Sequence, residues 1–186
     1  MSAVGDNRTE QAEALLALYD RSLPQVYGYL VRRTGDPTIA EDLTAETFLA
    51  AVALIRSAVV QDVTAAWLVG IARHKLVDHW RRLEREERRL QAVAAITTDV
   101  DDPWDGHVDA TVARQVVAAL TPNHRAALTL RYADGLPVRE VARLLDRTEH
   151  ATEALLVRAR RSFREAYLAL DPPEAPMSPG GEHDDH

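Results

Sequence analysis

Arginine side chains offer the most evident chemistry in this sequence, because they cluster in two segments where they could bind phosphate. The first segment, residues 73–89, holds more bases than acids. Its bases are Arg73, Lys75, Arg81, Arg82, Arg85, Arg88 and Arg89, and its acids are Asp78, Glu84, Glu86 and Glu87. The second segment contains Arg158, Arg160, Arg161 and Arg164. Such basic segments are typical of contacts with nucleic-acid phosphates.

Two residue pairs have the spacing of an acid–base pair on a helix. Asp42 and Glu46, and His74 and Asp78, are each four residues apart, so each pair shares a helix face. No nucleophile elbow, phosphate-binding loop or metal motif accompanies either pair, cysteine is absent and the seven histidines are scattered. We therefore expect no catalytic residue, no metal site and no cofactor.

The net charge of -7 conflicts with unaided DNA binding. The acids concentrate in a stretch without Lys or Arg, at Asp99, Asp101, Asp102, Asp105 and Asp109, and in the tail after Leu170. The sequence has no apolar run long enough for a membrane span, and its N-terminal residues are polar. We expect a cytoplasmic protein without membrane insertion.

Apolar residues recur at three- and four-residue spacing between Gly and Pro punctuation, which predicts an all-α fold. The first predicted domain, residues 10–92, contains four helices, at about Glu10–Arg21, Pro24–Arg33, Pro37–Ile55 and Thr64–Leu90. An acidic linker is predicted at 93–107 and a disordered tail at 171–186. The second predicted domain, residues 108–170, contains helices at about Val108–Leu120, Pro122–Ala133, Val138–Leu145 and Glu149–Leu170.

The last two predicted helices are separated only by Asp146, Arg147 and Thr148, the arrangement of a helix-turn-helix. Ala142 is small enough for a close helix crossing, Asp146 tolerates a left-handed backbone and Thr148 can cap the next helix. The positions expected to face the core are Thr152, Leu156, Ala159, Phe163, Tyr167 and Leu170. The alternative is a helical hairpin whose arginines are only solvated.

Three blocks of sequence, residues 40–49, 67–82 and 135–145, together resemble the extracytoplasmic-function (ECF) sigma factors, group 4 of the sigma-70 family. The similarity covers about Leu15–Leu170. It implies a sigma-2 domain that reads the −10 promoter element, a flexible linker and a sigma-4 domain that reads the −35 element.

The resemblance also implies which residues bind. Those matching the contact with the clamp of the largest polymerase subunit are Asp42, Leu43 and Glu46; in the alternative interpretation Leu43 and Phe48 are core and the acids are solvated. Those matching the −10 segment are Arg73, His74, Lys75, Trp80, Arg81 and Arg82. Trp67 is expected in the core, whereas the Trp80 ring could pack inside or stack on a base.

The −35 candidates are Arg147, Thr148, His150, Glu153, Arg158 and Arg160, and Arg125 could add a contact. The sequence departs from the family at Glu153 and Leu155, where Lys or Arg is usual. A glutamate can accept a hydrogen bond from cytosine, but phosphate affinity should be weaker.

The expected function is that of an ECF sigma factor, which binds core RNA polymerase and promoter DNA and is held by an anti-sigma factor. Two alternatives remain open. One is a self-sufficient helix-turn-helix regulator that binds a palindromic site. The other is an interaction protein with degenerate DNA binding.

Overall fold

The computed structural model describes the backbone of residues 3–56, 63–90 and 109–170, and the side chains of residues 19–56, 63–89 and 109–170. Every element in this part of the chain is a helix, which confirms the all-α prediction. The helices are α1 (Ala3–Thr34), α2 (Pro37–Arg56), α3 (Ala65–Leu90), α4 (Ala110–Ala119), α5 (Pro122–Leu128), the π-helical turn η1 (Thr129–Ala133), α6 (Val138–Leu145) and α7 (Glu149–Leu170).

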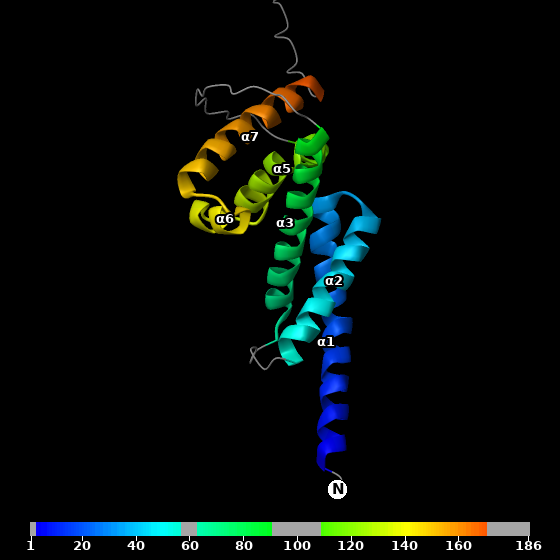
Figure 1. Cartoon of the computed structure of the whole chain (residues 1–186). Helices are drawn as coiled ribbons and strands as arrows, with labels where there is room; N and C mark the ends of the chain where they lie inside the picture. Colours follow the sequence, from blue (N-terminus) through cyan, green and yellow to red (C-terminus); the bar gives the residue numbers. More distant parts are fainter. Residues whose placement is uncertain (1–2, 57–62, 91–108, 171–186) are drawn as a thin grey trace, which may run out of the picture.

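Helices α1, α2 and α3 pack against one another as a three-helix bundle, which we call the N-terminal half (Figure 1). Its core includes Leu30 of α1, Phe48 of α2 and Leu76 of α3. The α1–α2 turn is fixed by Gly35, which has a φ of +70°, and by Asp36, whose carboxylate accepts the Thr38 N–H at 2.8 Å. The predicted start of this helix at Asp36 and Pro37 is therefore confirmed.

The two helices predicted before residue 34 are one continuous helix in the structure. Pro24 lies inside α1, where it removes one backbone hydrogen bond. On either side of it the helix buries Ser22 and Val26, so packing against the bundle offsets the missing bond. The sequence rule that proline begins a new helix was wrong at this position, and the N-terminal half has three helices where four were predicted.

Helices α4–α7 form the C-terminal half and gather around the upper part of α3 (Figure 1). The predicted helix from Pro122 to Ala133 ends at Asp134 and Gly135, as expected, but its last turn widens into η1. The Asp134 N–H donates to the Thr129 carbonyl at 3.0 Å, and Gly135 has a φ of +68°. This wide turn is followed by Gly135, whose left-handed backbone suits glycine. Together they set the direction in which the Asp134 side chain leaves the helix.

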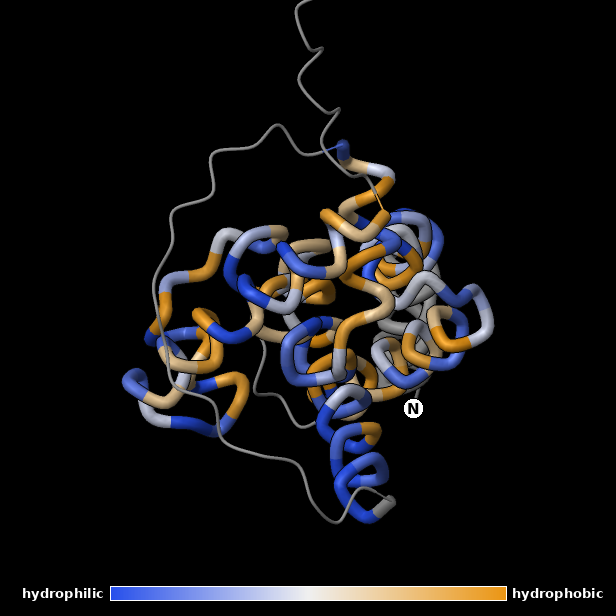
Figure 2. Tube along the Cα trace, turned by 90° about the horizontal axis from the view of Figure 1, so that it is seen from above, coloured by the Kyte–Doolittle hydropathy of each residue, from blue (hydrophilic) through white to orange (hydrophobic). Residues whose placement is uncertain are grey.

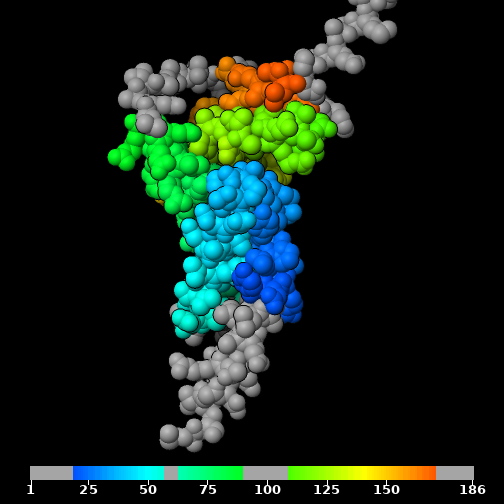
Figure 3. All heavy atoms as spheres, turned by 90° about the vertical axis from the view of Figure 1, so that its right-hand side faces the viewer, coloured from blue at the N-terminus to red at the C-terminus, as the bar shows by residue number. Residues whose placement is uncertain are grey.

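The two halves pack directly on each other. One core cluster joins Leu30 and Leu76 of the N-terminal half to Leu130 and Val141 of the C-terminal half. The space-filling view shows the C-terminal helices seated on the end of the bundle (Figure 3). In the end-on view, hydrophobic positions gather where helices face one another (Figure 2). The predicted linker and tail lie outside the described residues, so the predicted domain boundaries stay predictions.

None of the helices in the described ranges combines the length and the apolar content that crossing a bilayer requires.

Candidate nucleic-acid interface

The turn between α6 and α7 has the geometry predicted for a helix-turn-helix. Asp146 adopts a left-handed backbone with φ 53° and ψ 51°, and the Arg147 N–H donates to the Ala142 carbonyl at 2.9 Å. The Thr148 hydroxyl accepts the Ala151 N–H at 3.1 Å and so caps α7. Ala142 is buried at the crossing of the two helices. These contacts fix the angle at which α7 leaves the turn.

One side of α7 packs into the C-terminal half. The predicted core residues Thr152, Leu156, Ala159 and Tyr167 are buried, and Phe163 packs against a small cluster around Leu128. Leu170 is exposed, so its predicted burial was wrong; it is the last residue of the helix and has no element to pack against in the described part of the chain.

Leu155, which departs from the usual basic residue of the family, is buried with a relative exposure of 4%. It belongs to the core cluster that holds α7 against α5 and α6. Its apolar character therefore has a structural cause and says nothing against DNA binding. Glu153 is exposed, so burial does not explain why an acid stands there in place of the family's usual Lys or Arg.

His150, Glu153, Arg158 and Arg160 on α7 are all exposed. At about 100° per residue His150, Glu153 and Arg160 lie within a sector of about 80°, whereas Arg158 is turned about 140° from Glu153 and about 160° from Arg160. Arg158 lies toward His124 of α5. Burial of His124, and after it the positive charge of Arg158, lowers the pKa of that histidine. The structure thus separates Arg158 from the other predicted −35 contacts on α7.

Trp80 lies inside the bundle, with a relative exposure of 2%. Of the two alternatives for its ring, packing is the one that the structure shows; stacking on a base stays a prediction that would require the ring to leave this position. Trp67 is half-buried and packs against the same core, as expected.

The remaining −10 candidates divide into exposed and paired side chains. His74 and Arg82 are exposed on α3. Lys75 lies 3.5 Å from Glu46, and Arg81 lies 3.8 Å from Asp78. His79, on the same helix, is half-buried, and burial first and the Arg82 charge second lower its pKa, so it adds no positive charge at neutral pH.

Helix α2 buries Leu43 and Phe48, so these two side chains pack in the core as the alternative interpretation held. Asp42 is exposed and Glu46 is partly exposed beside Lys75. Leu49, which sequence reasoning missed, continues the same face one turn later with a relative exposure of 71%. A helical projection of the sequence would have placed Leu49 beside Asp42 and Glu46. A large apolar residue next to two acids on an exposed face is typical of a protein-binding surface.

Arg125 does not face the predicted DNA side. Its guanidinium donates to the carbonyls of Ala118 and, at 3.2 Å, Leu120, and so satisfies the C-terminal end of α4. Burial lowers its pKa. Arg125 was expected as a possible DNA contact. In the structure it instead joins α5 to the end of α4.

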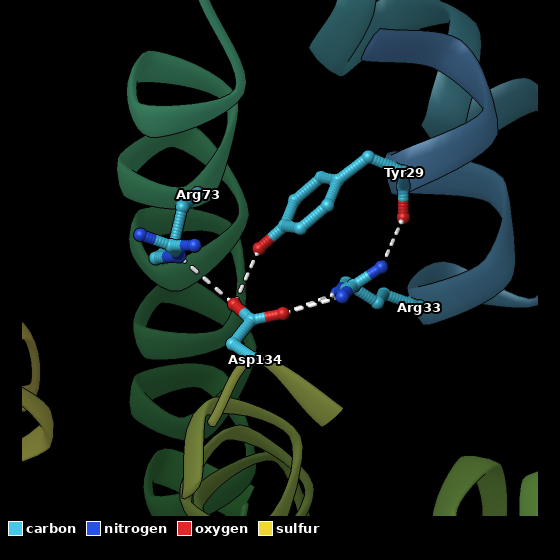
Figure 4. A network of polar contacts seen from close by, with 4 residues as sticks. All are labelled: Tyr29, Arg33, Arg73 and Asp134. Carbon is cyan, nitrogen blue, oxygen red and sulfur yellow. Dashed lines mark hydrogen bonds and ion pairs between the residues drawn. The ribbon is translucent and has the colours of Figure 1, made fainter. Parts of the chain in front are cut away.

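Asp134 is the polar residue that sequence reasoning interpreted only as a helix stop. Its side chain, 1% exposed, accepts from Tyr29 at 2.8 Å and from Arg73 at 2.9 Å (Figure 4). Arg33 donates to the other carboxylate oxygen through Nε, at 3.0 Å, and through Nη2. We call Tyr29, Arg33, Arg73 and Asp134 the Asp134 cluster. It ties Arg73, a predicted −10 contact, to the C-terminal half.

Comparison with known proteins assigns both halves of the chain. Residues 18–86 match the family "Sigma-70 region 2" and residues 111–163 match "Sigma-70, region 4". The chain is 33% identical over 168 residues to the ECF RNA polymerase sigma factor BldN of Streptomyces coelicolor, covering 88% of this chain and 64% of that protein. It thus spans just under two thirds of that relative's length.

Two further similarities concern the sequence and the fold. The ECF RNA polymerase sigma factor SigK of Mycobacterium sp. (strain KMS) is 33% identical over 144 residues, covering 72% of both chains. The fold resembles that of the sigma factor RpoE solved in complex with the anti-sigma factor NepR from Bartonella quintana, with a TM-score of 0.50 and 22% identity over 82% of this chain and 95% of that one. The chain belongs to the ECF RNA polymerase sigma factors.

Proposed function

We propose that this protein binds core RNA polymerase and directs it to promoters that carry a −10 and a −35 element. The polymerase supplies the catalysis, and the chain contributes binding only. Its net charge of -7 fits this division, because affinity for DNA is then shared with a larger basic partner. The place of action that follows is the cytoplasm.

One observation carries the proposal. The helix that follows the left-handed turn at Asp146 is capped at Thr148 and keeps His150, Glu153 and Arg160 exposed along one side. A helix presented in this way can enter the major groove and read base edges near its N-terminal end. We assign to the −35 element Arg147, Thr148, His150, Glu153 and Arg160, with Arg158 as a flanking phosphate contact.

The −10 contacts that we propose are Arg73, His74, Lys75, Arg81 and Arg82 on α3. Strand opening needs no covalent chemistry, only tighter binding of unpaired than of paired DNA. Trp80 is buried in this conformation, so we assign phosphate contacts to the five basic side chains and leave the preference for unpaired bases to stacking or pockets that form when the complex opens.

The polymerase contact that we propose is the exposed face of α2 made by Asp42, Glu46 and Leu49. The acids suit basic residues on the polymerase clamp, and Leu49 supplies an apolar centre. Leu43, buried beneath this face, supports it from inside. An anti-sigma factor is the further partner that membership of the family implies.

A binding assay separates this function from the alternatives. Core RNA polymerase, the purified protein and a labelled duplex library are mixed in all pairwise and three-way combinations, and complexes are resolved by gel filtration. We expect the protein to bind the polymerase, and selective retention of duplexes only in the three-way mixture. Specific duplexes retained by the protein alone would support a self-sufficient regulator.

The exposed Glu153 is the one observation that favours an interaction protein with degenerate DNA binding. An interaction protein would bind the polymerase or another protein, but no mixture would retain particular duplexes. Replacing Glu153 with Lys would not change this result. In a sigma factor, the same replacement changes the preferred −35 sequence.

A further inference from the structure

The Asp134 cluster joins two halves of the chain that a sigma factor must use at separate places on DNA. Tyr29 and Arg33 come from α1 and Arg73 from α3, whereas Asp134 comes from the turn after η1 (Figure 4). All the hydrogen bonds that Asp134 receives from side chains in this cluster thus cross between the halves.

The three donors form a site for one anion. Arg33 is held in place by its own neighbour, because it donates to the Tyr29 carbonyl at 3.1 Å and lies 3.7 Å from the centre of the Tyr29 ring. Burial, followed by the Asp134 charge, raises the pKa of Tyr29, which keeps its hydroxyl protonated as a donor. Two guanidinium groups and a hydroxyl converging on two oxygens suit a phosphodiester as well as a carboxylate, since each anion carries one negative charge.

A second polar contact crosses the same interface. Glu84 of α3 accepts from the Asn123 side chain and lies 3.9 Å from the Arg147 guanidinium. Arg147 is a proposed −35 contact, as Arg73 is a proposed −10 contact. We call the structure with the two halves packed together the closed arrangement. In it, an arginine of each proposed DNA-binding region contacts an acid of the opposite half.

The closed arrangement is too short for a promoter. The −10 and −35 elements lie about 25 base pairs apart, roughly 85 Å at 3.4 Å per base pair. Helix α3, which carries the −10 candidates and contacts α5 and α6, has 26 residues and is about 39 Å long. The halves must separate before both elements can be bound at once.

We propose that the Asp134 cluster is an autoinhibitory contact in which the Asp134 carboxylate occupies a phosphate site formed by Tyr29, Arg33 and Arg73. The site becomes available to the DNA backbone only when the halves separate. This inference rests on the proposed function for its ligand, whereas the closed contact itself can be tested on the free chain.

Opening is measured by energy transfer between two dyes. The chain has no cysteine, so Glu41→Cys on α2 and Ala169→Cys on α7, both at exposed positions, give a specific labelling pair. We expect a high-transfer population to dominate in the parent and the low-transfer fraction to rise in Asp134→Asn and in Arg33→Gln, since the shared apolar core still favours the closed arrangement. Asp146→Asn is the matched control, because it removes the same charge from an exposed turn where asparagine also accepts the left-handed backbone.

Phosphate binding is measured with a short labelled oligothymidine. Asp134→Asn should bind it about ten-fold more tightly than the parent, within the usual range of coupling between two conformations. Arg33→Gln should open the chain but gain less, because it removes one donor of the site. Unchanged helicity by circular dichroism shows that each variant is folded.

Unchanged energy transfer in both folded variants would overturn the closed contact, and opening of Asp134→Asn without tighter oligothymidine binding would overturn the phosphate site. Failure of the proposed function is recognised separately, because the parent chain and all variants would then fail to bind core polymerase whatever their energy transfer.

Discussion

Single side chains decide what this protein can contact. Among candidate binding residues of the same helix, solvent exposure shows which ones a partner can reach. Asp42, Glu46 and Leu49 present one face of α2 to solvent, while Leu43 on the same helix is buried. On α7, Glu153 is exposed and Leu155 is core. The family resemblance placed Leu43 among the polymerase contacts and Leu155 at a position that is usually basic, and the structure buries both side chains in the core.

The first prediction concerns Glu46. Replacing it with Lys should weaken binding of core polymerase about ten-fold, or roughly 1.4 kcal/mol, because it reverses a charge facing a basic partner. The measurement is a titration of labelled protein with core polymerase in the absence of DNA.

The control for this prediction is the charge-swapped variant Glu46→Lys with Lys75→Glu, which restores the ion pair inside the chain. The swapped variant should bind polymerase as weakly as Glu46→Lys. Recovery of parent affinity would mean that repulsion from Lys75, and not the partner, caused the loss.

The second prediction ranks two arginines of α7. Arg160→Ala should reduce −35-dependent transcription by the equivalent of about 1 to 3 kcal/mol, since Arg160 lies in the same sector as His150 and Glu153. Arg158→Ala, turned away from that sector, should cost less and equally on promoters with altered −35 sequences. The ranking is checked by initiation rates on matched promoter variants; a larger, sequence-dependent loss for Arg158→Ala would contradict it.

Residue-level predictions from sequence succeeded where local chemistry was sufficient. The cap at Thr148 and the left-handed Asp146 depend only on neighbours in the chain, and both were predicted. The burial of Trp80 depends on the whole bundle, because polar neighbours in sequence do not reveal which helix face is covered. Asp134 and its partner Tyr29 are 105 residues apart in sequence, so no local pattern could indicate their contact.

At the level of helices, most starts and stops could be predicted from sequence, with one wrong division. Asp36, Thr64, Pro122 and Gly135 each mark a boundary in the structure within a residue or two of the prediction. Pro24 was the exception, because burial of Val26 and Leu30 outweighs the missing backbone bond.

The third prediction follows from that exception. Pro24→Ala should stabilise the protein by about 2 kcal/mol, because alanine restores the backbone N–H donor and Pro24 is exposed, so no packing is lost. Chemical denaturation followed by circular dichroism measures the change. A loss of stability would show that the proline is needed for the shape of α1.

The fourth prediction concerns the start of α4. The Asp109 carboxylate accepts the Val112 and Thr111 N–H groups, at 3.0 and 2.7 Å, and these bonds lower its pKa. A lowered folded-state pKa contributes stability above the unfolded value, near pH 4, that is lost as pH falls through the folded value.

An asparagine in place of Asp109 would cap the helix without this pH dependence. The melting temperature of the parent should therefore exceed that of Asp109→Asn at about pH 6, and the difference should shrink toward about pH 3. Differences that stay constant over this range would contradict the assigned charge effect.

At the scale of the whole molecule, the two halves were expected as separate domains, but in the described residues they share one apolar core and are joined by polar contacts around Asp134 and around Glu84. The sequence predicted the halves and their helix-turn-helix, because periodicity and punctuation act within each half. Packing between them depends on matching surfaces far apart in sequence, such as Asp134 against Arg33, and lay beyond pattern reasoning.

The central claim is that the chain makes core RNA polymerase initiate at promoters, and run-off transcription tests it most directly. Genomic fragments of the source organism are transcribed by purified core polymerase with and without the protein. We predict initiation at defined sites only when the protein is present, with aligned start sites that share sequences near −10 and −35. Identical transcripts with and without the protein, from a polymerase that is active with another sigma factor, would contradict the claim.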